Sequence, residues 1–150
     1  MNKMLTDKII YDVLIVGSGV AGMYGALQFD ENTDVLLLAK YGKDVSNSNL
    51  AQGGIAAVLD LEDDSYDLHV QDTMIAGGHA NDIEAVDTLV REGPDDVRII
   101  MEQMGADFDR NDDGTLDKTL EGGHCRRRIM HYKDSTGAEM VRKLIAETEK

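Results

Sequence analysis

The 150-residue sequence predicts an α/β fold, part of a Rossmann-like domain with a parallel sheet, extra helices and a β-hairpin. Two apolar runs, residues 11–16 and 35–39, are typical of strands that are buried on both faces of a parallel sheet. A glycine-rich turn and a helical pattern separate these runs. Strand, helix and strand within so short a segment favour a right-handed βαβ unit.

The first half of the chain continues with a helix, a loop and a second helix. Apolar residues at helical spacing from Met23 to Phe29 predict the helix between the two strands. Residues 41–54 have no hydrophobic period and are rich in Ser, Asn and Gly, which predicts a long loop with a function. Ser65 predicts the N-cap of a helix that runs to Ala76.

Two more helices are predicted in the middle of the chain. Asn81 with Glu84 forms a variant capping box for a helix that reaches Glu92. Pro94 suits the first position of the next helix, and Gly105 suits the position after its end. That helix would turn four apolar residues inward: Val97, Ile100, Met101 and Met104.

The last part of the chain predicts a hairpin and a final helix. Phe108 to Leu116, bent at Asp113-Gly114, predicts the β-hairpin. Thr136 as N-cap, with Glu139 three residues later, opens a helix that runs to the last residue and has Val141, Leu144 and Ile145 on one face. Because such a helix normally leads to a further parallel strand, we expect residues 1–150 to be the N-terminal part of a larger domain.

Composition excludes several classes of function. The 15 Lys and Arg against 29 Asp and Glu give a net charge of −14, which argues against nucleic acids and anionic membranes as partners. Cys125 is the only cysteine, so no intrachain disulfide can form and a reducing cytoplasm is expected. No apolar run resembles a secretory signal or could cross a bilayer. We therefore expect a cytoplasmic protein.

A dinucleotide-binding fingerprint lies between the first predicted strand and helix. Gly17, Gly19 and Gly22 form the pattern G-x-G-x-x-G. The first glycine allows the tight turn, the second lets the backbone approach a pyrophosphate, and the third allows close packing of helix on strand. The pattern predicts a bound dinucleotide; the alternative is a glycine turn without a ligand.

The second half of the fingerprint departs from the rule. A carboxylate that binds the adenosine ribose is expected about 20 residues later, at the end of the second strand. That strand ends in Ala39-Lys40, and Asp34 lies at its other end. The lysine therefore favours another dinucleotide, such as FAD, over NAD.

Three segments together resemble the N-terminal part of the L-aspartate oxidase family, within the fumarate reductase and succinate dehydrogenase flavoprotein superfamily. They are DVLIVGSGVAG at residues 12–22, SNLAQGGIAAV at 48–58, and EGGHCRRRIMH at 121–131, which is followed by DSTG at 134–137. The resemblance runs across nearly the whole chain. It implies an FAD-binding domain whose capping and C-terminal helical domains are absent from this chain.

The resemblance also assigns cofactor contacts. Ser18, Gly19, Val20 and Ala21 would lie along the pyrophosphate of FAD, and Lys40 near its adenosine end. The flavin half would follow Asn47, Ser48, Asn49, Leu50, Ala51, Gln52, Gly53 and Gly54. In the dehydrogenase and fumarate reductase branches a histidine of this loop bonds covalently to the flavin; Asn47 stands there, so the resemblance implies noncovalent FAD. The alternative for residues 46–49 is a solvated turn.

Glu121 is the residue that the resemblance assigns to substrate choice. The glutamate of the E-G-G-H motif would orient aspartate, because its carboxylate pairs with the substrate ammonium group and repels plain dicarboxylates. The alternative is a surface glutamate beside a glycine turn.

The implied function is flavin-dependent oxidation of L-aspartate to iminoaspartate, the entry step to NAD synthesis. Hydride would pass to FAD, which oxygen or fumarate would reoxidise, and a quinolinate synthase would consume the product. The 150 residues alone are expected to be inactive. The alternatives are a fumarate reductase or succinate dehydrogenase-like flavoprotein and a non-catalytic flavin-binding module.

Other chemistry-bearing residues are weighed and set aside. Arg126, Arg127 and Arg128 could raise the local potential, but we expect at least two of them to pair with acids. Asp109 to Gly114 begins like a calcium loop but has Leu120 where the bidentate glutamate is required. Four further expectations follow: Cys125 is a bystander, His124 and His131 bind no zinc, Met74, Met101 and Met104 fill the core, and no metal is bound.

Overall fold

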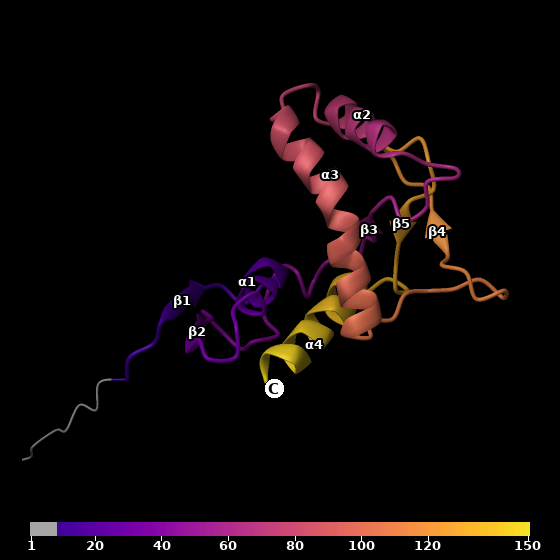
Figure 1. Cartoon of the computed structure of the whole chain (residues 1–150). Coiled ribbons are helices and arrows are strands. Elements are labelled where there is room, and N and C mark those ends of the chain that lie inside the picture. Colours follow the sequence, from indigo (N-terminus) through magenta and orange to yellow (C-terminus); the bar gives the residue numbers. More distant parts are fainter. Residues whose placement is uncertain (1–8) are drawn as a thin grey trace, which may run out of the picture.

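The computed structural model describes residues 9–150 as an elongated molecule with a sheet near each end and helices between them (Figure 1). A parallel two-stranded sheet lies at one end, and an antiparallel three-stranded sheet lies at the other. Residues 1–8, which contributed to the expectation that no secretory signal is present, lie outside the described part.

The predicted βαβ unit is confirmed. It consists of β1 (Val13–Val16), α1 (Val20–Ala26) and β2 (Val35–Leu38). The two strands are parallel, with Val13 opposite Val35 and Val16 opposite Leu38. The helix begins and ends three residues earlier than the hydrophobic spacing predicted, because it starts directly after the glycine turn.

The prediction that both strands are buried on two faces is wrong for the described residues. Leu14 and Val16 are 59% and 76% exposed, and Leu38 at the end of β2 is exposed too. Burial alternates along β1, because α1 packs against one face and no other described helix packs closely on the opposite face.

The second sheet was not predicted. It has the order β3 (Ile55–Ala56), β5 (Ile129–Met130), β4 (Lys118–Thr119), and both pairings are antiparallel. Strands of two residues are too short to show a period of two in the sequence. The predicted hairpin just before β4 is confirmed as an antiparallel bridge between Arg110 and Leu116, and it turns at Gly114.

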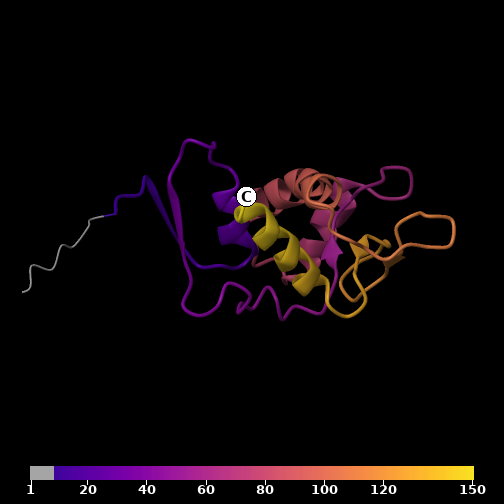
Figure 2. The ribbon, with the colours of Figure 1, turned by 90° about the horizontal axis from the view of Figure 1, so that it is seen from below.

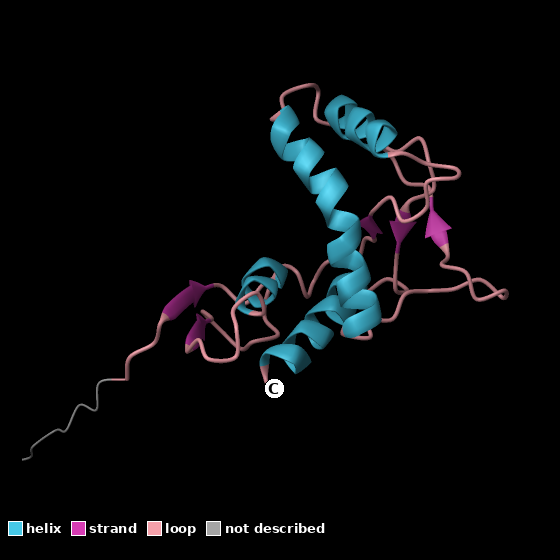
Figure 3. Ribbon diagram, in the orientation of Figure 1, coloured by secondary structure: helices cyan, strands magenta, loops and turns pink. Residues whose placement is uncertain are grey.

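In the middle of the chain, the helices predicted from Asn81 to Glu92 and from Pro94 to Gly105 form one continuous helical segment. The helix α2 (Tyr66–Ala76) begins as expected, since the Ser65 hydroxyl accepts a hydrogen bond from Leu68 N–H. The next helix, α3 (Ile83–Arg98), passes through Pro94 and continues as the π-helix η1 (Ile99–Gln103) (Figure 3).

A continuous buried face explains why Pro94 does not break α3. Val86, Val90 and Val97 lie buried on both sides of Pro94, which is itself buried. Burial of this face outweighs the backbone hydrogen bond that proline removes. The N-cap is Asp82 rather than Asn81, and its carboxylate accepts the N–H groups of Glu84 and Ala85.

The final helix, α4 (Thr136–Thr148), has Ser135 rather than Thr136 at its N-cap position and ends before the last residue. Thr136 is buried, and its hydroxyl accepts the N–H of Tyr132 instead of capping the helix. Glu139 is also buried, where its carboxylate accepts the N–H of Asp107 and pairs with Arg142.

The core consists of two neighbouring apolar clusters. One contains Ala57, Val97, Ile100, Ala106, Phe108, Met130 and Met140, and the other contains Met23, Val141 and Leu144. Val20, Tyr24 and Met104 pack against both clusters and thereby join α1 to the rest of the molecule. Met101 and Met104 contribute to the core, as expected.

The start of α4 packs tightly against the long loop that follows β2. Gly137 N–H donates a hydrogen bond to the carbonyl of Ala51 at 3.0 Å. A Cβ at position 137 would lie 2.0 Å from the carbonyl oxygen of Ser48 and 2.8 Å from Ala51 Cβ. Only glycine therefore allows this contact.

Replacing Gly137 by alanine should lower the free energy of unfolding by about 2 kcal/mol, because backbone atoms must move to accommodate the methyl group. Gly93→Ala is the matched control, since Gly93 lies inside α3 with open space around its Cα and should be unchanged or stabilised. Urea unfolding of the two variants tests this. Equal stability of the two variants would contradict the packing described here.

Candidate functional site

The turn between β1 and α1 requires glycine at two positions. Gly17 has φ +119°, a backbone conformation that other residues rarely adopt. A Cβ on Gly22 would lie 1.9 Å from the carbonyl oxygen of Gly17. Helix α1 can therefore begin close to the end of β1 only with this pair of glycines.

The start of α1 presents free backbone donors. Gly19 occupies the N-cap position and provides no side-chain cap. Within residues 9–150, the N–H groups of Ala21 and Gly22 have no hydrogen-bond acceptor, while Val20 N–H donates to Ser48 Oγ at 3.1 Å. Free N–H groups at a helix start attract anions, and a pyrophosphate is an anion of suitable size.

The loop predicted to follow the flavin lies against this helix start. Ser48 contacts α1 directly through the hydrogen bond to Val20. Successive turns shape the loop, in which Leu50 N–H donates to the carbonyl of Asn47 and Ala51 N–H to that of Ser48. The structure thus brings together the two segments that the sequence assigned to the two halves of one cofactor.

The far end of this loop is fixed by a close backbone approach. A Cβ on Gly54 would lie 2.4 Å from both Met130 O and Ile129 Cγ2, so the loop passes against β5. Between its two fixed ends the loop leaves several predicted cofactor residues exposed: Asn47, Leu50, Ala51, Gln52 and Gly53. Exposed small residues and backbone groups could contact a planar ring.

Lys40 lies at the same sheet edge as the glycine turn. It follows the end of β2, and the carbonyl of Leu38 at that end accepts Gly17 N–H at 2.9 Å. The Lys40 side chain is exposed, with its ammonium group 5.2 Å from the centre of the Tyr41 ring. Ligands of open α/β sheets bind at this carboxyl edge of the strands.

Glu121 lies elsewhere, in the loop between β4 and β5. The loop lies beside α2 and apart from β1 and β2 in both views of the ribbon (Figures 1 and 2). The Glu121 carboxylate is exposed and makes no ion pair with any residue of the described part. Its backbone carbonyl accepts His124 N–H at 3.2 Å, which closes a turn.

A buried charged cluster holds this loop in place. The guanidinium of Arg128 is 1% exposed, donates to both carboxylate oxygens of Asp64 at 2.7 and 2.8 Å, and donates to Asp72 Oδ2 at 2.6 Å. His124 Nδ1 lies 3.1 Å from the same guanidinium. The His69 ring packs 5.5 Å from the His124 ring, and its buried Nδ1 has no partner within residues 9–150.

Burial, hydrogen bonds and charge shift the pKa values of the groups in the cluster, among them His69, Asp64 and Asp72. Burial, with the positive charge of Arg128 nearby, lowers the pKa of His69 to about 4, so this ring is neutral near pH 7. Burial alone would raise the pKa values of Asp64 and Asp72. Hydrogen bonds from Arg128 and Ser65 N–H outweigh this effect at Asp64, and those from Cys125 N–H and Arg128 outweigh it at Asp72. Both pKa values are therefore held below the usual range.

The expectation that at least two of the three arginines pair with acids is wrong. With partners in residues 9–150, only Arg128 of the three forms ion pairs, whereas Arg126 donates to the carbonyls of Asp63 and Cys125 and Arg127 to the carbonyl of Lys118. The Cys125 thiol is exposed. No group of three or more His, Cys, Asp or Glu side chains suited to a metal ion occurs within residues 9–150.

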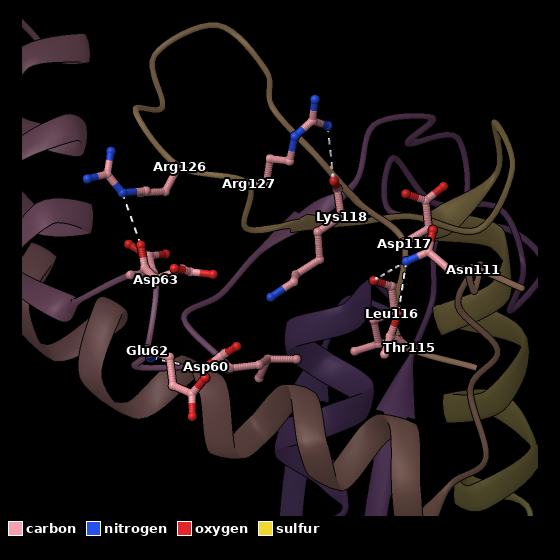
Figure 4. Close-up of a pocket in the computed structure, with 12 residues that line it drawn as sticks. Asp60, Glu62, Asp63, Asn111, Thr115, Leu116, Asp117, Lys118, Arg126 and Arg127 are labelled. Carbon is pink, nitrogen blue, oxygen red and sulfur yellow. Dashed lines mark hydrogen bonds between the residues drawn. The ribbon is translucent and has the colours of Figure 1, made fainter. Parts of the chain in front are cut away.

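A cavity of about 1100 Å³ lies between the loop after β3 and the hairpin (Figure 4). Acidic side chains of Asp60 and Glu62 line one side, and Lys118 and Arg127 lie across from them. Neither the glycine turn nor Glu121 contributes to its lining. This cavity is therefore separate from the candidate dinucleotide site.

In the part of the chain that the structure describes, every helix is too short or too polar to span a bilayer.

Lowering the pH from 6.5 to 4 should reduce the free energy of unfolding by up to about 3 kcal/mol through His69. Below pH 6.5, His69 of the unfolded chain binds a proton, whereas the buried ring in the folded chain stays neutral down to about pH 4. The free energy of unfolding therefore decreases as the pH falls. Below pH 3.8, protonation of Asp64 and Asp72 in the unfolded chain lowers stability further. Urea unfolding at several pH values measures both effects.

The control for this pH dependence is the exposed His79, which is replaced by Asn. His69→Gln should lose the decline in stability between pH 6.5 and 4, whereas His79→Asn should keep it. A decline of the same size in His69→Gln would show that another group causes it.

The chain is similar to known proteins in both sequence and structure. The chain is 44% identical over 90% of its length to L-aspartate oxidase of Arabidopsis thaliana and 45% identical over 91% to that of Streptomyces coelicolor. It spans only 20% and 24% of the lengths of these curated relatives. The solved FrdA chain of Escherichia coli quinol fumarate reductase superposes with a TM-score of 0.86 at 30% identity, over 93% of this chain and 24% of that one.

The family model described as FAD binding domain matches residues 12–150. This range includes the glycine turn, the loop packed on α1 and the Arg128 cluster. The expectations of an FAD-binding domain and of a resemblance to L-aspartate oxidases are therefore confirmed. The chain belongs to the FAD-binding domain family.

Proposed function

We propose that this chain is the FAD-binding part of a flavoenzyme that oxidises L-aspartate to iminoaspartate. The observation that carries the proposal is the 44–45% identity to L-aspartate oxidases over about nine tenths of the chain. Because the chain spans a quarter or less of these relatives, the capping domain, the helical domain and further substrate ligands are assigned to the rest of such an enzyme.

The residues present fit FAD. The free N–H groups of Ala21 and Gly22 suit its pyrophosphate, and the exposed residues Gln52 and Gly53 suit its ring system. FAD supplies a hydride acceptor when it is bound. Asn47 has no nucleophilic ring nitrogen, so we assign noncovalent binding.

Glu121 is assigned to orient the substrate. Its exposed carboxylate has no ion-pair partner among residues 9–150 and is available to the ammonium group of aspartate. The same charge repels dicarboxylates that lack an amino group. Oxygen or fumarate would accept the electrons, and a quinolinate synthase would consume the iminoaspartate.

The likeness to quinol fumarate reductase supports a second candidate, reduction of fumarate or oxidation of succinate. Asn47 and Glu121 favour the aspartate oxidase instead, because the first excludes a histidyl flavin bond and the second favours an ammonium group. A non-catalytic flavin-binding module is the third candidate, and it predicts FAD binding without any oxidation of aspartate.

Binding of FAD depends on the glycine turn. The test uses a chimera in which residues 12–150 replace the matching segment of the Streptomyces coelicolor oxidase. Gly22→Ala should weaken FAD binding at least about tenfold, because its methyl group would collide with Gly17 O. Gly25→Ala, in the same helix with open space around it, should stay within about twofold. Flavin fluorescence quenching measures both, and equal affinities would contradict the assignment.

Aspartate oxidation by the same chimera tests Glu121. Glu121→Gln should lower kcat/KM for L-aspartate by about 10- to 100-fold, because a charge-assisted hydrogen bond is lost. Glu62→Gln, at an exposed acid in the separate cavity, is the control and should change little. A chimera that binds FAD but does not oxidise aspartate would contradict the proposed function. FAD that stays with the denatured protein would contradict noncovalent binding.

A further inference from the structure

Resting on the proposed function, we propose that Asp72 is a positioning residue, which fixes the Glu121 loop on α2 and thereby places the Glu121 carboxylate for the substrate ammonium group. Nothing in the local sequence links the two residues, because Asp72 lies on α2 and Glu121 lies far along the chain. Asp72 contacts Cys125 and Arg128, which follow Glu121 in the same loop.

A single oxygen of Asp72 accepts two hydrogen bonds from the second half of the loop. Asp72 Oδ2 accepts Cys125 N–H at 2.8 Å and Arg128 Nη1 at 2.6 Å. The first bond fixes the backbone just after the Glu121 turn, and the second fixes the side chain of Arg128, the residue before β5. Loss of this one oxygen would therefore release the turn from α2.

The turn itself transmits the restraint to Glu121. The carbonyl of Glu121 accepts His124 N–H, and the His124 ring lies 3.1 Å from the Arg128 guanidinium. Gly123, with φ +85°, lies against α2, where a Cβ would be 3.5 Å from Ala76. The segment from Glu121 to Cys125 is thus held by backbone and ring contacts, while the Glu121 carboxylate stays exposed.

The second carboxylate of the cluster does a different job. Asp64 binds the Arg128 guanidinium through both oxygens and has no hydrogen bond to the loop backbone. A buried ion pair contributes little net stability, but removing one carboxylate leaves the buried guanidinium of Arg128 incompletely neutralised, which is destabilising. Loss of either carboxylate removes one of the two negative charges that pair with Arg128, but only Asp72 also accepts a hydrogen bond from the loop backbone.

Hydrogen exchange in the full 150-residue chain is the first test. Asp72→Ala should speed exchange of the hydrogen-bonded amides of His124 and Cys125 at least about tenfold, while Asp64→Ala should keep them within about threefold. Amides of α4 serve as the internal reference for global unfolding. If the alanine variants do not fold, Asp72→Leu and Asp64→Leu, which keep most of the side-chain volume without an acceptor, replace them and must show the same order. Equal exchange of the loop in both variants would overturn the proposal.

Substrate selectivity in the chimera is the second test. Asp72→Ala should lower kcat/KM for L-aspartate about tenfold, yet leave fumarate reduction by a reduced viologen dye within about twofold, because fumarate has no ammonium group. It should lower aspartate oxidation little further in the Glu121→Gln background, since both changes remove the same interaction. Equal losses with both substrates, or additive losses, would overturn the proposal.

These outcomes separate the two proposals. If the unsubstituted chimera fails to oxidise aspartate, the proposed function is wrong. The hydrogen-exchange experiment then still tests whether Asp72 attaches the Glu121 loop to α2. If the chimera is active and Asp72→Ala keeps full selectivity for aspartate, only the positioning role of Asp72 falls.

Discussion

The candidate site depends on one contact: the loop after β2 packs closely between the start of α1 and the start of α4. Ser48 accepts the Val20 N–H of α1 through its hydroxyl, and its carbonyl occupies the space that a side chain at Gly137 of α4 would need. The loop is therefore positioned by backbone contacts rather than by long side chains. A planar ring and a pyrophosphate require this kind of surface, because both bind best where the main chain can approach closely.

The sequence predicted the parts of the fold that depend on local patterns. The βαβ unit, the Ser65 cap and the glycine turn each lie within one short segment, so their residues carry a complete signal. The second sheet could not be predicted, because its two-residue strands gain their stability from partners that are far apart in sequence. The prediction that a new helix starts at Pro94 was wrong for a related reason. The buried face of α3 extends beyond Pro94, and tertiary packing outweighs the tendency of proline to interrupt a helix.

The candidate site was predictable to a similar degree. The glycines and the loop after β2 could be assigned to one cofactor from spacing and resemblance, and the structure brings them together. The attachment of the Glu121 loop could not, because Asp64 and Asp72 lie 64 and 56 residues from Arg128 and have no motif of their own. Buried ion pairs of this kind join segments whose contact only the folded chain reveals.

The most direct test of the account is an NMR titration of the ¹⁵N-labelled chain with ADP, which carries the pyrophosphate and adenosine of FAD. We expect the largest amide shifts at Ala21 and Gly22, the two free donors at the start of α1, with smaller shifts at Lys40. Saturable shifts centred on another surface, with Ala21 and Gly22 unchanged, would contradict the assignment of this helix start to the cofactor.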